Sequence, residues 1–480
     1  MHTFYREGTG ILTLKEIIEA TGGRVILGNP DTAVFSGVSI DSRTIKEGEL
    51  FVALKGERFD GHEFLLSAME KGKGAVVSIP PAVAFRGKTI VYVRNTLKSL
   101  QDIAHYMRMK RGITVVGITG TNGKTTTKEL ISSILGRGHR VMKNSGNLNN
   151  HIGLPLSMTR IGEQDEYAVM EMGASMRGDI QELCQIAAPE YGVITNIGPG
   201  HLEGFGDLES VRDTKLELFD AVNTIAVNAD DVFLMEGITQ RARKDRPKVI
   251  TFGIGNGADV SAKDIVLEER RSLFSICLKD GQCRETALHV SGRFNISNAL
   301  AAASVCSALG VGSEDITAGI RSFVGVPMRL EMKELFGATV ISDVYNANPA
   351  SMEEAIKELV RLRKKRALAV LGDMLELGAY AEEAHRKLGK WISQLPVDVL
   401  IAVGPLMAVA AEEFSAENSH SRRMTLPARD SSEARRILFS IWSEGDTVLV
   451  KGSRGMHMER IVEDASGSAT DFMVRGGNAL

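Results

Sequence analysis

One stretch decides the fold class of this 480-residue chain: Thr119-Gly120-Thr121-Asn122-Gly123-Lys124-Thr125-Thr126. It follows the apolar run 113–118 and precedes a segment with helical periodicity that starts near Lys124. A glycine-rich turn between a buried strand and a helix is the setting of a phosphate-binding loop, because backbone N–H groups and the helix N-terminus both attract an anion there. The stretch therefore predicts an α/β domain that binds ATP.

Within this loop, Lys124 is placed to reach the terminal phosphates and the hydroxyl of Thr125 to ligate Mg²⁺. The standard motif has a glycine five residues before its second glycine, and Ile118 stands there instead. An ordinary glycine-rich turn is the alternative, but it leaves Gly-Lys-Thr-Thr directly after a buried strand unexplained. We expect the following residues to bind ATP: Gly120, Thr121, Asn122, Gly123, Lys124, Thr125 and Thr126.

Strands predicted at 167–172, 193–197 and 225–228 alternate with helical segments, which indicates a mainly parallel sheet. Glu171 ends one of these strands, and His201 follows another through a Gly-Pro-Gly turn. Both lie at the edge of the sheet that carries the phosphate loop, so each is a candidate Mg²⁺ ligand. The alternatives are a solvated glutamate at a strand end and a polar surface histidine.

Lys215 lies on the apolar stripe of a helix predicted over 211–222, four residues after Val211 and four before Phe219. Buried lysines are rare unless they are paired or functional. The alternative is a lysine whose apolar stem is buried while its amine reaches water. We take Lys215 as a candidate catalytic residue.

Two further regions flank the nucleotide-binding part. The region before residue 110 mixes short strands and helices, and the region from 327 onward has the alternating pattern of a doubly wound sheet. Asp343, Asp373, Gly404 and Lys451 all stand at the carboxyl ends of its predicted strands, where open α/β sheets bind ligands. The predicted domains are 1–110, 111–326 and 327–480.

Composition narrows the function classes. The chain is 43% hydrophobic and 24% charged, with a formal net charge of −3. It therefore lacks the excess of basic residues that would indicate nucleic acid as a partner. Neither a signal peptide nor an apolar stretch of membrane-spanning length is recognisable. The four cysteines form no CxxC pair, which predicts reduced thiols and no structural zinc site. We expect a cytoplasmic monomer that does not insert into membranes.

These features come together in a resemblance to the Mur ligases of bacterial cell-wall synthesis, over nearly the full length of the chain. The run Tyr345-Asn346-Ala347-Asn348-Pro349 and the run 372–378 (Gly-Asp-Met-Leu-Glu-Leu-Gly) are most similar to the branch that adds D-alanyl-D-alanine. The remaining stretches that carry the resemblance are Asp41-Ser42-Arg43, Asp60-Gly61-His62, the phosphate loop, 146–150, 171–175, 195–198, 201–203, 294–298 and 451–454.

The resemblance implies three domains, one for the UDP end of the substrate, one for ATP and one that closes over both. It implies that UDP-N-acetylmuramoyl-tripeptide and D-alanyl-D-alanine are joined with ATP and Mg²⁺, and that Lys215 is carbamylated. Asn295 and Asn298 would lie near adenine, Arg329 would contact phosphate, and Asp343 and Asn346 would reach the nucleotide. The implied substrate-binding residues are Ser39, Asp41, Ser42, Arg43, Asn149, Ser175, Asp373 and Lys451.

Two other readings stay open at this point. A related amide ligase of the folylpolyglutamate type would lack the 110 or so residues that precede the phosphate loop here. A P-loop ATPase that couples hydrolysis to a change of shape would release phosphate without any acceptor. The third residue of the peptide substrate cannot be read from the sequence.

Overall fold

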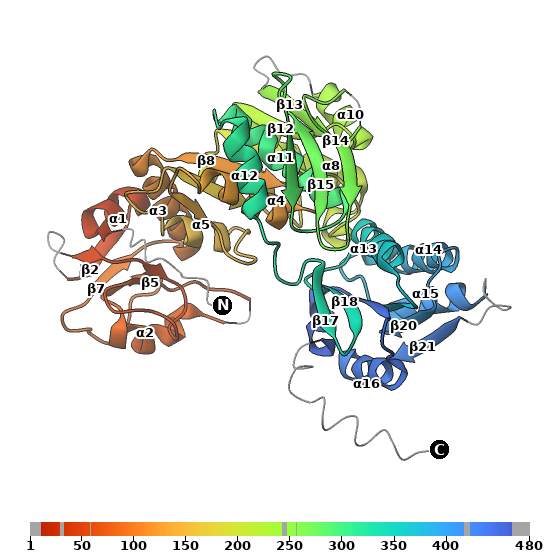
Figure 1. Cartoon of the computed structure of the whole chain (residues 1–480). Helices are drawn as coiled ribbons and strands as arrows, with labels where there is room; N and C mark the ends of the chain where they lie inside the picture. The colour runs from red at the N-terminus through yellow and green to blue at the C-terminus, as the bar shows by residue number, and fades with distance from the viewer. Residues whose placement is uncertain are drawn as a thin grey trace.

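The computed structural model of the chain describes residues 11–28, 33–57, 59–241, 247–255, 257–416 and 423–462. Its elements form three units, each built on a sheet of its own, and Figure 1 shows the central unit between the other two. We call these the N-terminal, central and C-terminal units. The predicted α/β class with three sheet-based parts is confirmed. The predicted boundaries, after residues 110 and 326, fall between the sheets and stay a proposal.

The central unit holds a nine-stranded sheet in the order β16-β15-β14-β13-β12-β11-β8-β10-β9, parallel from β9 to β14 and antiparallel at β15 and β16. β8 lies inside it, so its residues are buried on both faces. The strands are β8 (Thr114–Thr119), β9 (Val141–Lys143), β10 (Tyr167–Glu171), β11 (Tyr191–Ile194), β12 (Thr224–Asn228), β13 (Lys248–Gly253), β14 (Val260–Leu267), β15 (Ser272–Cys277) and β16 (Cys283–Leu288). The predicted strands differ from these only at their ends.

Helices cover both faces of this sheet. One apolar core lies between the sheet and α4, α11 and α12, and a second lies on the opposite face under α5, α6, α9 and α10. Burial of the α4 stripe, which includes Leu130 and Ile131, contributes roughly 2 kcal/mol per side chain. The helices are α4 (Lys124–Leu135), α5 (Gly153–Met158), α6 (Asp179–Ala187), α7 (Leu202–Phe205), α8 (Leu208–Lys215), α9 (Glu217–Ala221), α10 (Val232–Gln240), α11 (Arg293–Ala308) and α12 (Ser313–Ser322).

The C-terminal unit holds a six-stranded sheet in the order β17-β18-β22-β19-β20-β21, antiparallel only at β17. Separate apolar cores lie on its two faces, as a doubly wound sheet requires. Its elements are β17 (Glu331–Leu335), β18 (Ala338–Asp343), α13 (Pro349–Leu362), β19 (Ala367–Gly372), the 3₁₀ helix η2 (Gly378–Tyr380), α14 (Ala381–Ser393), β20 (Val399–Val403), α15 (Pro405–Ala416), β21 (Met424–Ala428), α16 (Ser431–Ile441) and β22 (Thr447–Lys451).

The N-terminal unit holds a five-stranded sheet in the order β2-β7-β6-β5-β4, and β1 pairs with β3 beside it. α1 begins with a capping box in which Thr13 and Glu16 satisfy each other's backbone N–H groups. The elements are β1 (Leu12–Thr13), α1 (Leu14–Thr21), β2 (Arg24–Leu27), β3 (Val34–Phe35), β4 (Val38–Ser39), β5 (Leu50–Val52), α2 (Leu65–Lys71), β6 (Gly74–Val77), β7 (Thr89–Tyr92) and α3 (Thr96–Arg111).

Two expectations are wrong in detail. The helix predicted over 211–222 is interrupted at Leu216, so Lys215 is the last residue of α8 rather than a mid-helix residue. The thiols are not all reduced, because Cys277 and Cys283 form a disulfide. These two cysteines are direct partners across β15 and β16, with Cα atoms 4.0 Å apart, which a search for CxxC spacing does not detect. Within the described parts of the chain, no helix combines the length and apolar character needed to cross a membrane.

Candidate active site

The phosphate loop connects β8 to α4 and depends on two glycines with positive φ. Gly120 has φ +142° and Gly123 has φ +81°, and a Cβ on either would collide with a neighbouring side chain, Thr195 or Asn298. Ile118 belongs to β8 and is fully buried, which explains why no glycine is needed there. No side chain of the described residues caps the first turn of α4, so its N–H groups are left for an anion.

Lys124 folds back over the loop that precedes it. Its Nζ donates to the carbonyl oxygens of Gly120 at 2.8 Å and Thr121 at 3.1 Å. Burial lowers the pKa of this amine, and the nearby charge of Arg329 lowers it further, while Glu171 raises it. An anionic phosphate at this position would replace the carbonyl partners and favour the charged amine.

Glu171 lies beside the loop because β10 pairs with β8, with Glu171 opposite Ile118. Its carboxylate is 3% exposed and accepts hydrogen bonds from Thr125 Oγ1 and Asn149 Nδ2, both at 2.8 Å. Adjacent hydroxyl and carboxylate oxygens are the hard donors that Mg²⁺ prefers. The described residues contain no group of three or more His, Cys, Asp or Glu side chains arranged around a metal, so this pair suits an ion that keeps waters or phosphate oxygens as its other ligands.

Arg329 brings a cation from the C-terminal unit to the same place. Its Nη2 donates to Thr125 Oγ1 at 3.3 Å, and its guanidinium stacks over the Tyr345 ring at 3.9 Å. Its Nε is buried and has no hydrogen-bond partner among the described residues. A guanidinium with a spare donor beside a phosphate loop is suited to bind a phosphate oxygen.

His201 and Lys215 lie near this group without joining it. His201 begins α7 and its Nδ1 is 2.8 Å from Glu376 Oε2 of the C-terminal unit. Lys215 is 3% exposed, and its Nζ lies 5.9 Å from the centre of the Phe205 ring. Burial, followed by the charge of Lys124, lowers the pKa of Lys215 to about 7. No hydrogen bond or ion pair in the described chain joins His201 or Lys215 to Thr125 or Glu171.

Comparison with known proteins extends this geometry. Residues 118–306 match the family described as Mur ligase middle domain, 328–454 match the Mur ligase glutamate ligase domain, and 34–108 match the Mur ligase family catalytic domain. The chain belongs to the Mur ligase family. The predicted resemblance is therefore confirmed, and the N-terminal match is the region that distinguished it from folylpolyglutamate-type ligases.

Individual relatives cover nearly the whole Mur ligase chain. The UDP-N-acetylmuramoyl-tripeptide–D-alanyl-D-alanine ligase of Bacillus subtilis is 36% identical over 94% of this chain and 98% of its own length. The enzyme of the same name from Escherichia coli is 34% identical over 88% of this chain and 92% of its own length. A crystal structure of MurF from Acinetobacter baumannii superposes with a TM-score of 0.86 at 30% identity, covering 95% of this chain and 99% of that one. The structure of MurF ligase from Thermotoga maritima in complex with ADP superposes with a TM-score of 0.77 at 30% identity. The match covers 89% of this chain and 96% of that one.

The Mur ligase resemblance implied a second group of nucleotide contacts on α11 and the C-terminal sheet. Asn298 lies against Gly123 and receives a long hydrogen bond of 3.5 Å from Thr127, whereas Asn295 Nδ2 donates to the carbonyl oxygen of Ser291 at 2.7 Å. Both asparagines are buried. Thr126 is also buried, in the first turn of α4.

Four candidate residues of the C-terminal unit are engaged internally. Lys451 Nζ contacts Asp343 Oδ2 at 2.5 Å and the carbonyl oxygen of Asn346 at 2.9 Å, as the pairing of β18 with β22 dictates. Asp373 is buried and accepts a hydrogen bond of 2.6 Å from the Met407 N–H. In this arrangement these side chains hold the strand ends together, and any contact with a ligand stays a prediction.

The predicted substrate residues are spread over all three units, and those of the N-terminal and central units lie apart from each other. Ser39, Asp41, Ser42 and Arg43 lie at the turn after β4 in the N-terminal unit, where Arg43 binds both carboxylate oxygens of Asp41 and lowers the pKa of Asp41 to about 2. In the central unit, Asn149 donates a hydrogen bond to Glu171, and the N–H of Ser175 donates to the carboxylate of Asp179 at 2.7 Å. No hydrogen bond or ion pair in the described chain links the turn after β4 to the phosphate loop.

Two residues at the site, Asn348 and Lys128, were not among the site residues predicted from the sequence. Asn122 and Asn348 exchange side-chain hydrogen bonds of 2.8 and 3.3 Å between the central and C-terminal units. Lys128 is fully buried on α4 and donates to the carbonyl oxygen of Asn144 at 2.7 Å, within 4.0 Å of Glu171. Lys128 lies on the apolar stripe of α4, three residues before Ile131, so the kind of signal that revealed Lys215 on its own helix was also present here. Asn348 depends on contact between units, which no local pattern reveals.

Proposed function

We propose that this Mur ligase uses ATP to join D-alanyl-D-alanine to UDP-N-acetylmuramoyl-tripeptide during synthesis of peptidoglycan precursors. The two UDP-N-acetylmuramoyl-tripeptide–D-alanyl-D-alanine ligases described above match 94 and 88% of the chain, at 36 and 34% identity. The observation that carries the chemistry is the meeting of Lys124, Thr125 and Arg329 at one phosphate loop. A cytoplasmic location, where such precursors are made, is part of this proposal, as is a monomeric state.

ATP is proposed to place its phosphates in the loop from Gly120 to Thr126, with Asn295 and Asn298 near the adenine. The ADP complex of the Thermotoga maritima relative supports a nucleotide site in this fold. Lys124 would exchange its two carbonyl partners for phosphate oxygens, and Arg329 would use its unpaired Nε. Asp343 and Asn346 are proposed to approach the nucleotide from the C-terminal unit.

Mg²⁺ is proposed to bind between Thr125, Glu171, His201 and a carbamylated Lys215. Bound there, the ion would neutralise the charge of the phosphates during transfer. Lys215 has the properties that carbamylation requires, because only a neutral amine adds CO₂ and a pKa of about 7 leaves about half of it neutral at neutral pH. The product is an anion beside Lys124, which replaces a buried unpaired cation with a favourable pair.

The reaction proceeds in two steps that conserve every atom. The tripeptide carboxylate attacks the γ-phosphate of ATP, giving an acyl phosphate and ADP. The amine of D-alanyl-D-alanine then attacks the acyl carbon, its nitrogen gives up a proton to solvent, and inorganic phosphate leaves. Lys124 and Arg329 are proposed to stabilise the charge of the transferring phosphoryl group, which is the main contribution that a protein makes to this chemistry.

The N-terminal unit is proposed to hold the UDP end through Ser39, Asp41, Ser42 and Arg43. Asn149, Ser175, Asp373 and Lys451 are proposed to line the path of the peptide. The turn after β4 is well suited to its role because Asp41 orients Arg43, whose guanidinium is exposed to solvent and able to bind an anionic group.

One assay tests this function. Phosphate release is measured with ATP alone, with each substrate added separately and with both together. Release only with both substrates is expected, and Lys124→Ala should reduce the rate about a hundredfold or more. Lys143→Ala, an exposed lysine paired with Glu129, serves as the control and should keep the wild-type rate.

Two outcomes of the assay would contradict the proposal. Equal phosphate release without any acceptor would identify a P-loop ATPase. Release with UDP-tripeptide and a different amine, but none with D-alanyl-D-alanine, would identify a related ligase with another acceptor. A near-normal rate in Lys124→Ala would show that the phosphate loop does not take part in catalysis.

A further inference from the structure

His201 and Glu376 meet across the junction between the central and C-terminal units. His201 Nδ1 lies 2.8 Å from Glu376 Oε2, and the Glu203 N–H donates to the carbonyl oxygen of Glu376 at 3.2 Å. A Cβ on Gly378 would stand 3.1 Å from the Cα of Glu203, so the segment 376–378 lies directly on the start of α7. One side-chain pair and one backbone hydrogen bond therefore fix how these two segments dock.

Both residues have a left-handed backbone conformation, with φ +54° at His201 and φ +64° at Glu376. Non-glycine residues in that region cost roughly 1–3 kcal/mol each and persist only where the surroundings hold them. The strain orients the two side chains toward each other from opposite sides of the junction. A fortuitous surface pair would not require two strained residues.

The chemistry of the imidazole gives this pair a specific consequence. A hydrogen bond from Nδ1–H to a carboxylate leaves Nε2 as the nitrogen with a free lone pair, and no contact to His201 Nε2 occurs among the described residues. Histidines that bind metals commonly donate their other ring N–H to a carboxylate, which fixes the tautomer and the ring orientation.

We propose that Glu376 is a positioning residue that presents His201 to the metal only when the C-terminal unit is docked. This rests on the proposed role of His201 as a metal ligand. The metal site is then incomplete in an undocked chain, and metal binding and docking favour each other, as thermodynamic linkage requires. Glu376 itself contacts neither the nucleotide nor the metal.

The competing explanation is an ordinary exposed ion pair. The two side chains are 42% and 56% exposed, and exposed pairs contribute about 0–1 kcal/mol to stability. A simple ion pair would change the affinity for a metal only through docking, and therefore no more than another exposed interdomain pair does. Removing a residue that orients a metal-binding histidine, by contrast, lowers the affinity for the metal by roughly tenfold or more.

The test measures Mn²⁺ binding to the full chain in the presence of ADP, by electron paramagnetic resonance. Glu376→Ala should weaken Mn²⁺ binding about tenfold. Glu376→Gln should restore most of the affinity, because its amide oxygen still accepts the Nδ1–H hydrogen bond. The matched control is Glu334→Ala, which removes another exposed interdomain pair, with Arg270 at 3.0 Å, and should weaken the affinity much less because it acts through docking alone.

A double variant makes the test stricter. If Glu376 acts through His201, adding Glu376→Ala to His201→Asn should cause no further loss of Mn²⁺ affinity. Wild-type affinity in Glu376→Ala, an equal loss in Glu334→Ala, or additive losses in the double variant would each overturn the proposal. Absence of Mn²⁺ binding in the wild-type chain with ADP would contradict the proposed metal site itself, and this inference with it.

Discussion

The central unit meets its two neighbours in different ways. At the N-terminal junction, α3 contributes Leu100, Ile103 and Met107 to one apolar core and Ala104 to the core of the central unit. Among the described residues, neither core of the C-terminal unit includes a side chain of the central unit. That junction consists of polar contacts, including the Asn122–Asn348 exchange and the His201–Glu376 pair.

The difference indicates which junction moves. Separating the N-terminal unit would expose apolar surface at about 25 cal/mol per Å², whereas polar contacts between hydrated surfaces exchange for water at little cost. We therefore expect the N-terminal and central units to behave as one body and the C-terminal unit to open and close against it. A ligase whose two substrates and ATP must enter before the reaction needs such a motion.

The largest effect is expected from Arg108→Met at the N-terminal junction. Arg108 is 6% exposed, and its guanidinium donates to the carbonyl oxygens of Ala187 at 3.2 Å and Ala188 at 3.1 Å and pairs with Glu190. The Arg108→Met variant leaves the carbonyl groups at the end of α6 without these donors. This loss should lower the free energy of unfolding by roughly 3 kcal/mol. Urea denaturation measures the loss as a lower transition midpoint.

The control for this prediction lies two residues away on the same helix. Lys110 pairs with Glu16 within the N-terminal unit and is partly exposed, so Lys110→Met should cost less than about 1 kcal/mol. If Arg108→Met and Lys110→Met were equally stable, the N-terminal junction would not depend on the buried arginine.

Lys215 offers a contrast with Arg108. Both side chains are buried, but no carbonyl or carboxylate group of the described residues forms a hydrogen bond or ion pair with Lys215 as Ala187, Ala188 and Glu190 do with Arg108. The pKa of Lys215 is about 7 in the folded chain against the ordinary lysine value of 10.5, so the unfolded chain binds more protons between these two pH values. Stability relative to Lys215→Met should therefore rise with pH in this window, by roughly 1.4 kcal/mol per pH unit. Denaturation of both proteins in bicarbonate-free buffer, at several pH values above neutral, measures the slope.

Bicarbonate supplies the second half of this test. If the carbamate proposed above forms on Lys215, added bicarbonate should stabilise the wild-type chain and leave Lys215→Met unchanged. A flat pH dependence would mean that the Lys215 amine reaches water in solution and keeps an ordinary pKa. Bicarbonate stabilisation of both proteins would place the effect elsewhere.

The sequence predicted those features that depend on local pattern. The periodicity around Val211 and Phe219 placed Lys215 in the interior correctly, although the helix breaks at Leu216, because burial follows the stripe and not helix continuity. The strand–loop–helix around Lys124 was predicted for the same reason. Parallel strands place their carboxyl ends together, which predicted Glu171 at the phosphate loop, where it accepts a hydrogen bond from Thr125.

Features that depend on contact between distant segments could not be predicted. Asn348 caps α13, but its hydrogen bond to Asn122 depends on how the C-terminal unit docks. Glu376 stood in a turn with no sign of its histidine partner. The disulfide between Cys277 and Cys283 depends on the register of a hairpin, which the spacing of two cysteines does not determine.

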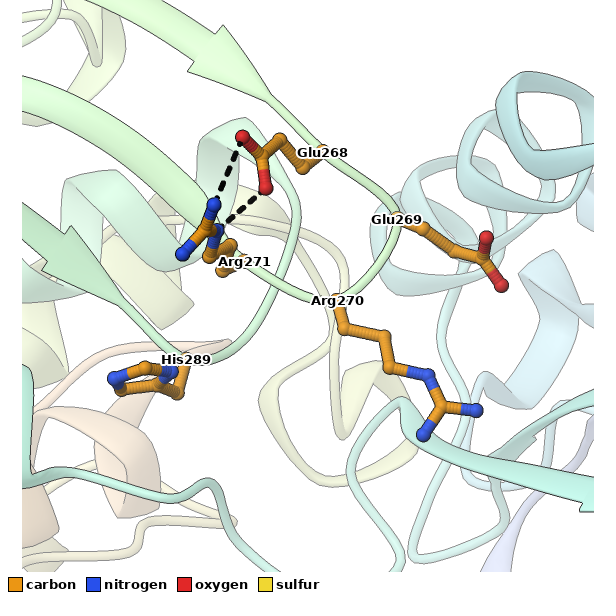
Figure 2. A pocket seen from close by; sticks show the side chains of 5 residues that line it. All are labelled: Glu268, Glu269, Arg270, Arg271 and His289. Carbon is orange, nitrogen blue, oxygen red and sulfur yellow. Dashed lines mark hydrogen bonds and ion pairs between the residues drawn. The ribbon is translucent and has the colours of Figure 1, made fainter.

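The smallest effect is expected at the tip of the β14–β15 hairpin, where Glu268, Glu269, Arg270, Arg271 and His289 line a hollow of about 310 Å³ (Figure 2). Glu269 pairs with Lys364, and Arg270 with Glu334, both at 3.0 Å across the C-terminal junction.

Replacing both turn residues, Glu269→Gln with Arg270→Gln, should weaken docking by about 1 kcal/mol or less in total, because all four side chains are well exposed. Small-angle X-ray scattering at low salt should show a slightly larger radius of gyration than for the wild type, and the difference should vanish at about 1 M salt, where the Debye length is about 3 Å. Arg271→Gln is the matched control, because Arg271 pairs with Glu268 inside the same turn, as the dashed lines of Figure 2 show. An equal expansion in that control, or one that persists at high salt, would mean that the turn does not hold the junction by charge.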